Sequence, residues 1–271
     1  VLPEGTEPRT LKAAGKIASQ RLAKPILLGK QEAIQKAVLA AEADLPGVDI
    51  ITVATPVAAH VPLTVDAMHA GKHVVCEKPS ALSLEENRRV IEVCEETGKQ
   101  VAFCSARMRT GYNHLAKQYV DDGDLGELYQ ANVTYYRRRG RPGLDCVVGA
   151  HWFLDSGLAG GGIIMDMGQY FMDAVLNMAG WPTIEAVSGA TFRGFDRGDL
   201  PEDVKFDVEE HCTFLARAEG DLTLVFDLAW VAHHSTFRQI KLLGTEGGIR
   251  MDGNDPFTFY SNKGGPWNWM N

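Results

Sequence analysis

The chain has 271 residues, a formal net charge of -8 at pH 7, 45% hydrophobic residues and 23% charged residues. This composition is typical of one large or two ordinary globular domains and excludes a disordered or fibrous chain. The negative charge disfavours nucleic acid as a partner. No apolar run reaches the roughly 20 residues of a membrane span, and the first residues are not a signal peptide. We therefore expect a soluble, cytoplasmic protein with no membrane partner.

The five cysteines are widely spaced and form no Cys-x-x-Cys pair. They are Cys76, Cys94, Cys104, Cys146 and Cys212. This spacing favours reduced thiols over a disulfide framework or a zinc site. His233 and His234 have no third ligand at suitable spacing, so no metal site is predicted.

Helices and strands alternate through the first part of the chain. Helices are expected at about 7–20, 31–42 and 59–70 and after the Ser83 cap, with strands at 25–29, 48–54, 73–76 and 101–104. Such alternation is typical of βαβ units. The sequence therefore predicts an α/β fold: a Rossmann-like, doubly wound parallel sheet over residues 1–105, which would bind a dinucleotide.

Strands dominate the rest of the chain. Helices are expected at 112–122 and 163–179, with strands at 128–138, 184–192, 209–217, 221–230 and 237–243 and short pieces after Gly247-Gly248. Short turns between successive strands indicate antiparallel pairing. We therefore predict an α+β domain over residues 106–271, with a large, mainly antiparallel open sheet for substrate binding and oligomerisation.

The strand at 73–76 runs directly into Glu77-Lys78-Pro79. Parallel sheets bind ligands at the carboxyl ends of their strands, where Glu77 and Lys78 would emerge. Pro79 ends the strand and fixes the turn. An ammonium at this place can polarise a substrate oxygen. The alternative is an exposed ion pair between Lys78 and Glu77.

From about residue 45 to 271 the chain resembles the Gfo/Idh/MocA oxidoreductase family. The matching motifs are Ala54-Thr55-Pro56 with His60, Ala70-Gly71-Lys72-His73-Val74, Glu77-Lys78-Pro79, Gly123-Asp124-Leu125-Gly126-Glu127, Gly160-Gly161-Gly162 with Asp166-Met167-Gly168, and Leu243-Gly244-Thr245-Glu246-Gly247-Gly248. The resemblance implies a Rossmann domain followed by an α+β domain. It also implies hydride transfer between NAD or NADP and a sugar, cyclitol or related polyol.

The resemblance implies roles for particular residues. Lys78 would lie beside the nicotinamide and the substrate, with a bond to Pro79 that is usually cis in the family. The residues expected to border the cofactor are Ala54, Thr55, Pro56, His60, Glu77, Lys78, Pro79 and Arg107. Thr55, Pro56 and His60 equally satisfy the needs of a turn and a helix start, and Arg107 equally suits a solvated position.

Asp166 and Tyr170 are four residues apart on one predicted helix and so share a face. Family members usually carry their His acid/base where Tyr170 stands. A tyrosine is a poor base at its ordinary pKa of about 10, but a nearby ammonium such as Lys78 lowers that pKa. Lys78, Asp166 and Tyr170 are therefore the candidate catalytic residues, with Asp166 orienting the substrate. The alternative is that Tyr170 is a half-buried aromatic and the base is lost.

Other candidate binding residues follow the 128–138 strand. Trp152, after His151, could line a sugar pocket beside Lys78, Asp166 and Tyr170, or pack in a core. The basic run Arg137-Arg138-Arg139 with Arg141 could bind an anionic substrate or partner. A solvated strand end is the commoner meaning of such a run.

The first forty residues depart from the family. They lack G-x-G-x-x-G, and residues 1–42 resemble part of phosphate acetyltransferase, which indicates a foreign N-terminal segment. Glu4 and Glu7 at the first helix start would repel a pyrophosphate, while Lys30 after the second strand would suit the 2′-phosphate of NADP. The abrupt ends at Val1 and Asn271 lead us to expect part of a longer protein.

Three functions are compatible with these residues. The first is an NAD(P)-dependent dehydrogenase acting on CH–OH groups, working as a homo-oligomer through the open sheet. The second is a non-catalytic binding or assembly protein that keeps the fold and has lost the cofactor fingerprint. The third, acyl transfer to phosphate, is the least favoured because the similar segment is short.

Overall fold

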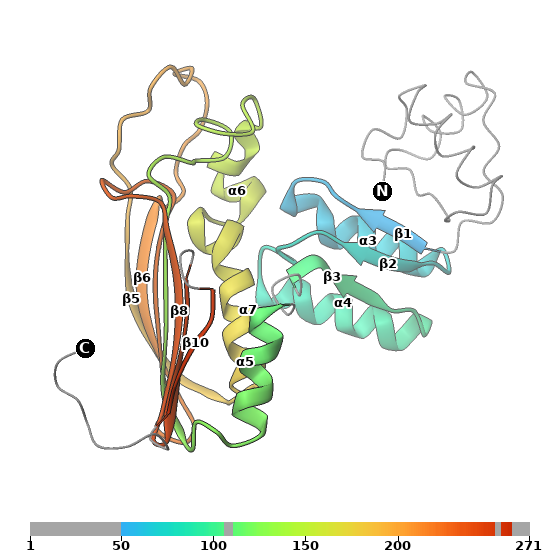
Figure 1. The fold of residues 1–271 in the computed structure, drawn as a ribbon. Coiled ribbons are helices and arrows are strands. Elements are labelled where there is room, and N and C mark those ends of the chain that lie inside the picture. Colours follow the sequence, from blue (N-terminus) through green and yellow to red (C-terminus); the bar gives the residue numbers. More distant parts are fainter. Residues whose placement is uncertain (1–49, 106–110, 253–255, 262–271) are drawn as a thin grey trace, which may run out of the picture. The chain divides into compact units, whose positions relative to one another are not determined.

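The computed structural model describes residues 50–105, 111–252 and 256–261 (Figure 1). The predicted helices at 7–20 and 31–42 and the predicted strand at 25–29 lie outside these ranges. The chain divides into two compact units. Unit 1 is Val1–Ser105 with Gly157–Gly160, and unit 2 is Ala106–Ser156 with Gly161–Asn271.

The described part of unit 1 is a parallel sheet with connecting helices. Its strands are β1 (Ile50–Val53), β2 (His73–Cys76) and β3 (Val101–Phe103), paired in the order β1-β2-β3. The turn η1 (Val57–Ala59) and the helix α3 (His60–His69) join β1 to β2, and α4 (Leu84–Thr97) joins β2 to β3. This confirms the predicted βαβ arrangement in the described residues.

Local sequence signals set the ends of α4. The hydroxyl of Ser83 accepts from the N–H of Glu86 at 3.2 Å, and the Glu86 carboxylate accepts from the N–H of Leu82 at 2.7 Å. Ser83 and Glu86 therefore form a capping box in which Glu86 accepts from the residue before the cap residue and not from Ser83 itself. Gly98 ends the helix with a φ of +64°, a conformation that glycine adopts without strain. One face of α4 then packs through Val90 and Val93 into the core of unit 1.

Unit 2 is built on a seven-stranded sheet with the order β10-β9-β8-β4-β7-β6-β5. The strands are β4 (Leu128–Tyr136), β5 (Ile184–Phe192), β6 (His211–Ala218), β7 (Thr223–Ala229), β8 (Phe237–Gly244), β9 (Gly247–Asp252) and β10 (Thr258–Ser261). All neighbours are antiparallel except β4 and β7, which are parallel. The predicted large, mainly antiparallel sheet is confirmed.

Helices cover one face of this sheet. They are α5 (Tyr112–Asp121), the π-helical turn η4 (Ile164–Gly168) and α7 (Gln169–Met178). Two short helices, η3 (His151–Leu154) and α6 (Ser156–Ala159), lie between β4 and η4 in the chain. Figure 1 shows α5 and α7 side by side along the sheet. Phe171 and Val175 of α7 share a core with Phe226 and Leu228 of β7. Alternate residues of β7 are buried, as expected for a strand covered on one face.

The opposite face of the sheet carries a polar cluster centred on Asp227. The carboxylate accepts from the Tyr136 hydroxyl, from Nε2 of His211 at 2.6 Å and from the Thr213 hydroxyl at 3.0 Å. Burial raises the pKa of Asp227, but these hydrogen bonds outweigh it and lower the pKa. Burial, followed by the bond to Asp227, raises the pKa of Tyr136 to about 12.

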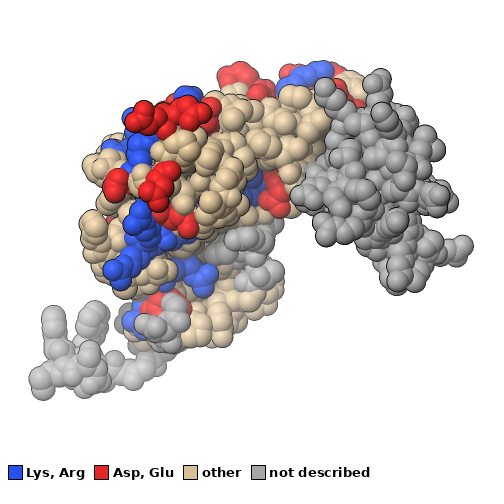
Figure 2. All heavy atoms as spheres, turned by 90° about the horizontal axis from the view of Figure 1, so that it is seen from above, with Lys and Arg blue, Asp and Glu red and all other residues tan. Residues whose placement is uncertain are grey.

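Three further features bear on partners. Every residue of the edge strand β5 is exposed, including Val187 and Phe192. On the face shown in Figure 2, basic side chains lie beside acidic ones among the described residues. No helix in the described ranges combines the length and the apolar character needed to cross a membrane.

Candidate functional site

Lys78 lies where the chain leaves the carboxyl end of β2. The pairing of β2 with β1 continues one residue past the strand, because the N–H of Glu77 donates to the Val53 carbonyl at 2.8 Å. The Glu77 carboxylate accepts from the main-chain N–H of Lys78 at 3.2 Å. The Lys78-Pro79 bond is cis. Lys78 is half-buried, and β2 is the middle strand of the described sheet, so its position is the one expected of a ligand-binding strand end.

His60 joins the loops that follow β1 and β2. The side chain is almost completely buried, at 1% exposure. Its Nδ1 lies 2.7 Å from the Pro79 carbonyl oxygen and its Nε2 lies 2.9 Å from the Thr55 carbonyl oxygen. A carbonyl only accepts, so each contact is a hydrogen bond when that ring nitrogen carries a proton. Both nitrogens of this predicted cofactor-binding residue are thus directed at the main chain.

The loop after β1 contains Ala54, Thr55 and Pro56, all half-buried. The hydroxyl oxygen of Thr55 is buried and has no hydrogen-bond partner among the described residues. A buried hydroxyl is normally paired with protein or a bound molecule. Thr55 therefore offers a donor and acceptor at the carboxyl end of β1. Arg107, the remaining predicted cofactor residue, lies outside the described ranges.

Asp166 lies in the π-helical turn η4, a feature that often marks functional sites. Its side chain is 11% exposed. The buried indole of Trp230 donates to its Oδ2 at 2.9 Å, and Nη1 of Arg137 lies 3.7 Å from the same oxygen. The Arg137 guanidinium also donates to the Tyr135 hydroxyl at 2.7 Å and to the Gly140 carbonyl at 2.8 Å. An indole and an anchored cation therefore fix the Asp166 carboxylate.

Tyr170 follows in the first turn of α7 and is 4% exposed. The structure places it on the same helical segment as Asp166, with the π-helical turn ending between them at Gly168. Trp152, in η3, is half-buried, and its ring stacks on Phe153 with centroids 3.7 Å apart. Stacking on a neighbour is compatible with either predicted role of Trp152.

Two further arginines of the basic run after β4, Arg139 and Arg141, pair with carboxylates. Arg139 donates to Asp145 at 2.8 Å, and Arg141 donates to Asp145 at 2.7 Å and to Glu210 at 3.1 Å. Arg141 is 1% exposed and Glu210 is completely buried. Burial raises the pKa of Asp145, but hydrogen bonds from Arg141 and Arg139 outweigh it and bring the pKa to about 2. The solvated strand end is therefore wrong for Arg141, while Arg138 is exposed.

The sequence did not indicate the role of Glu209. Its carboxylate accepts from the N–H of Gly162 at 2.8 Å and from the N–H of Ile164 at 3.0 Å. Three successive glycines indicate that another part of the chain approaches this turn closely. The structure shows that this neighbour is Glu209. Trp230 and Arg137 were likewise missed as partners of Asp166, because each meets it only through the tertiary fold.

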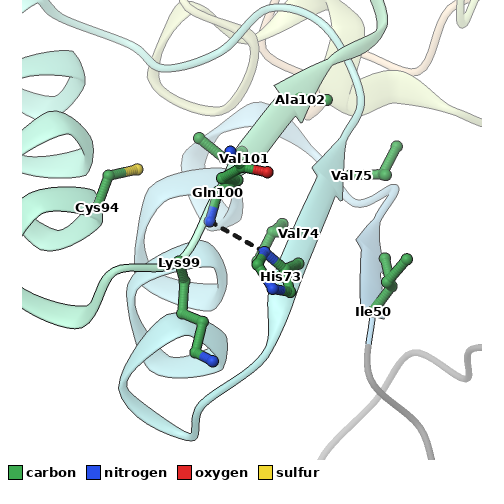
Figure 3. A pocket seen from close by; sticks show the side chains of 9 residues that line it. All are labelled: Ile50, His73, Val74, Val75, Cys94, Lys99, Gln100, Val101 and Ala102. Atoms are coloured by element: carbon green, nitrogen blue, oxygen red, sulfur yellow. Dashed lines mark hydrogen bonds between the residues drawn. The ribbon is translucent and has the colours of Figure 1, made fainter.

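A hollow in unit 1 lies at the other end of the parallel strands (Figure 3). It is lined by Ile50, His73, Val74, Val75, Cys94, Lys99, Gln100, Val101 and Ala102. The N–H of Gln100 donates to Nδ1 of His73 at 3.2 Å across it. His73 begins β2, so this is the amino end of the sheet, whereas parallel sheets bind ligands at the carboxyl end. The candidate site is the end that carries Lys78.

Two family models match this chain. The model for the GFO/IDH/MocA C-terminal domain matches residues 114–250. The model for the oxidoreductase family, NAD-binding Rossmann fold, matches residues 17–104. The second match includes much of the segment for which we predicted a foreign origin, so the family resemblance begins well before residue 45. None of these matches shows a phosphate acetyltransferase segment in residues 1–42.

Two curated relatives are sugar dehydrogenases by name. D-glucoside 3-dehydrogenase from Escherichia coli is 30% identical over 145 residues, which cover 54% of this chain and 40% of the relative. D-xylose 1-dehydrogenase [NADP(+)] from Haloarcula marismortui is 27% identical over 207 residues, covering 75% and 53%. The chain thus spans about half the length of the curated relatives it matches.

Solved structures support the fold. An inositol dehydrogenase homologue from Azotobacter vinelandii, complexed with NAD+, has a TM-score of 0.72 at 22% identity, covering 96% of this chain and 65% of that one. At this identity the likeness concerns the fold. The C-terminal domain model alone, however, matches half of the sequence. The chain therefore belongs to the Gfo/Idh/MocA family of oxidoreductases.

Proposed function

We propose that the protein transfers hydride between NAD or NADP and a sugar, cyclitol or related polyol. Family membership supports this function, as do relatives named as D-glucoside and D-xylose dehydrogenases. The observation that carries the proposal is the position of Lys78 at the carboxyl end of β2, where a parallel sheet binds its ligand.

We propose the following roles for the candidate catalytic residues. The Lys78 ammonium stabilises negative charge on the substrate oxygen as the C–H bond breaks. Tyr170 takes the hydroxyl proton as a phenolate during oxidation and, as the phenol so formed, returns it during reduction. Asp166, fixed by Trp230 and Arg137, accepts a hydrogen bond from the substrate and orients it. When bound, the nicotinamide supplies or accepts the hydride. Trp152 offers an aromatic face to the substrate.

The proposed cofactor-binding residues are those of the strand ends in unit 1, together with Arg107. The buried, unpartnered hydroxyl of Thr55 fits a polar group of a bound dinucleotide. Ala54 and Pro56 shape the same loop. Glu77 and Pro79 hold the loop that carries Lys78. His60 would act through the main chain, because its ring nitrogens face the carbonyls of Thr55 and Pro79.

We also propose a cytoplasmic homo-oligomer that forms through the open sheet face. The polar cluster around Asp227 and the exposed strand β5 support a contact there. Light scattering coupled to gel filtration tests this proposal. A monomer at micromolar concentration would contradict it.

A non-catalytic binding protein is the competing function, and the missing G-x-G-x-x-G favours it. The phosphate acetyltransferase resemblance of residues 1–42 stays a hypothesis about origin. Because the similar segment is short and lacks the rest of that enzyme, we expect no acetyl phosphate to form from acetyl-CoA. We expect NADH or NADPH fluorescence to change on binding and a polyol panel to show turnover. No binding at millimolar cofactor would reject the dehydrogenase.

Lys78→Ala provides the decisive variant. We expect it to lower kcat by a factor of about 10² to 10⁴, the range for general acid–base and electrostatic groups. Lys99→Ala is the matched control, because Lys99 lines the hollow at the opposite end of the strands. An unchanged kcat in Lys78→Ala, with turnover intact in the control, would rule out the proposed role of Lys78.

A further inference from the structure

One carboxylate binds the start of the helical segment that carries Asp166 and Tyr170. The Glu209 side chain uses one oxygen for the N–H of Gly162 at 2.8 Å and the other for the N–H of Ile164 at 3.0 Å. The N–H of Ile163, between them, donates to the Glu209 carbonyl at 3.2 Å. Three successive N–H groups, which have no partner inside the helix, are thus satisfied by one residue.

The contact between this turn and Glu209 depends on glycine. A Cβ on Gly162 would lie 1.8 Å from the Glu209 carbonyl oxygen and 2.8 Å from its carbonyl carbon. These are main-chain atoms, so no side-chain rotation can relieve the overlap. Gly162 therefore lets the helix start approach the main chain of Glu209 directly, which brings the carboxylate within reach of both N–H groups.

The charge of Glu209 suits its place. The N-terminus of a helix carries partial positive charge from its aligned peptide dipoles and unpaired N–H groups. A carboxylate that accepts two N–H bonds there makes charge-assisted hydrogen bonds, which are stronger and more directional than neutral ones. Replacing one oxygen by an amide nitrogen would place a donor against a donor.

The same short segment also connects to the partner of Asp166. The N–H of Trp230 donates to the carbonyl of Glu210 at 2.8 Å, and the Trp230 indole donates to Asp166 at 2.9 Å. Asp166 lies two residues after Ile164. Residues 209 and 210 therefore hold both the helix start and the strand end that supplies the indole.

We propose that Glu209 is a positioning residue, whose carboxylate sets the register and tilt of the helix start and so places Asp166 and Tyr170 for proton handling. The proposal rests on the proposed function of those two residues. Glu209 itself touches no reacting atom in this scheme. Its removal should loosen the helix start and leave cofactor binding in unit 1 intact.

The test compares Glu209→Gln and Glu209→Ala with Glu202→Gln in the 271-residue chain. Glu202 is exposed in the segment between β5 and β6, so its variant makes the same charge change without the helix contact. Hydrogen exchange measured by NMR should speed up at least tenfold at the Gly162 and Ile164 amides in Glu209→Gln and more in Glu209→Ala. We expect kcat to fall about tenfold in Glu209→Gln and further in Glu209→Ala. The cofactor affinity of both variants should stay within twofold of wild type.

The outcomes separate the two proposals. If Tyr170→Phe and Lys78→Ala keep wild-type turnover, the catalytic roles proposed for these two residues fail, whatever Glu209 does. If those variants lose turnover while folded Glu209→Gln keeps wild-type kcat, the positioning role is overturned. Unchanged exchange at Gly162 and Ile164 overturns it even without any measurable turnover. If Glu209→Ala does not fold, Glu209→Gln, which keeps the side-chain volume, tests the positioning role alone.

Discussion

The two units hold their candidate residues by opposite hydrogen-bond chemistry. In unit 1, His60 is directed at two main-chain carbonyls and so joins the loops after β1 and β2. In unit 2, Glu209 accepts from two main-chain N–H groups and so caps a helix. The first link needs ring N–H donors, and the second needs an ionised carboxylate. The positions of Lys78 and Asp166 should therefore respond to different perturbations.

Charge is buried in unit 2 in a way that sharpens this contrast. Arg141 and Glu210 form an ion pair with 1% and 0% side-chain exposure. In unit 1, the pairs of Arg89 with Glu92 and Glu96 lie on the exposed surface of α4. Exposed pairs add little to stability, whereas a buried pair that loses one partner leaves an uncompensated charge. Unit 2 should therefore depend more strongly on its ionised groups.

The largest effect is expected from Glu210→Ala. It leaves the buried Arg141 guanidinium without one partner and removes the acceptor of the Gly194 and Phe195 N–H groups. We expect the free energy of unfolding to fall by about 4 kcal/mol. Urea denaturation measures the change, and Glu96→Ala on α4 is the control that should leave unfolding almost unaltered. Equal losses of unfolding free energy in the two variants would show that unit 2 does not depend more strongly on its ionised groups than unit 1.

Gly162→Ala is expected to have the next largest effect. The added Cβ would overlap the Glu209 carbonyl, and we expect a loss of about 3 kcal/mol. Gly98→Ala in unit 1 is the control. Its φ of +64° makes alanine strained, but nothing lies within 4 Å of the added carbon, so we expect about 1 kcal/mol. Thermal unfolding of the two variants compares these losses. Similar shifts in Tm would show that backbone strain, and not overlap with Glu209, causes the loss of stability.

Acid should weaken unit 2 through Asp145. The pKa of this carboxyl is about 2 in the folded chain, below its ordinary 3.8, so it contributes stability above pH 4 that is lost as the pH falls toward 2. The side chain is 8% exposed, and the contribution is up to about 2 kcal/mol. Asp145→Asn should flatten the fall in unfolding free energy between pH 5 and pH 2. An unchanged slope would show that other carboxylates carry the acid dependence.

His60→Leu is expected to have the smallest effect. It leaves the carbonyls of Thr55 and Pro79 without their ring partner, at a cost of about 1.5 kcal/mol. His69→Leu is the control, since His69 is exposed on the same helix. The free energy of unfolding measured with denaturant and the cofactor affinity should both fall in His60→Leu and stay unchanged in His69→Leu. Weaker affinity at unchanged stability would instead indicate direct contact between the ring and the cofactor.

The sequence predicted the elements well because they depend on local patterns. The 73–76 and 184–192 strands have the predicted bounds, and Ser83 and Glu86 cap α4 as their spacing indicated. These features follow from apolar periodicity and short-range hydrogen bonds. The catalytic roles of Lys78 and Tyr170 toward a substrate stay a prediction.

The contacts that hold the candidate residues could not be predicted in the same way. Glu209 meets Gly162 across 47 positions, and Trp230 meets Asp166 across 64. No local spacing encodes such pairs. Arg141 looked like a solvated charge because its buried partner Glu210 is equally remote, although its second partner, Asp145, lies only four residues away. The π-helical turn also has no simple sequence signal, since its residues suit an ordinary α-helix.

The place of β4 in the sheet has a consequence for how the chain reaches its native state. β4 pairs with β7 on one side and β8 on the other. A ribosome therefore releases it long before either neighbour exists, since α7, β5 and β6 come first. Ala131 and Val133 of β4 are buried only after those neighbours arrive. Non-local pairing of this kind slows folding and leaves apolar strands open to aggregation. Unit 2 should thus limit the refolding rate and the yield of soluble protein.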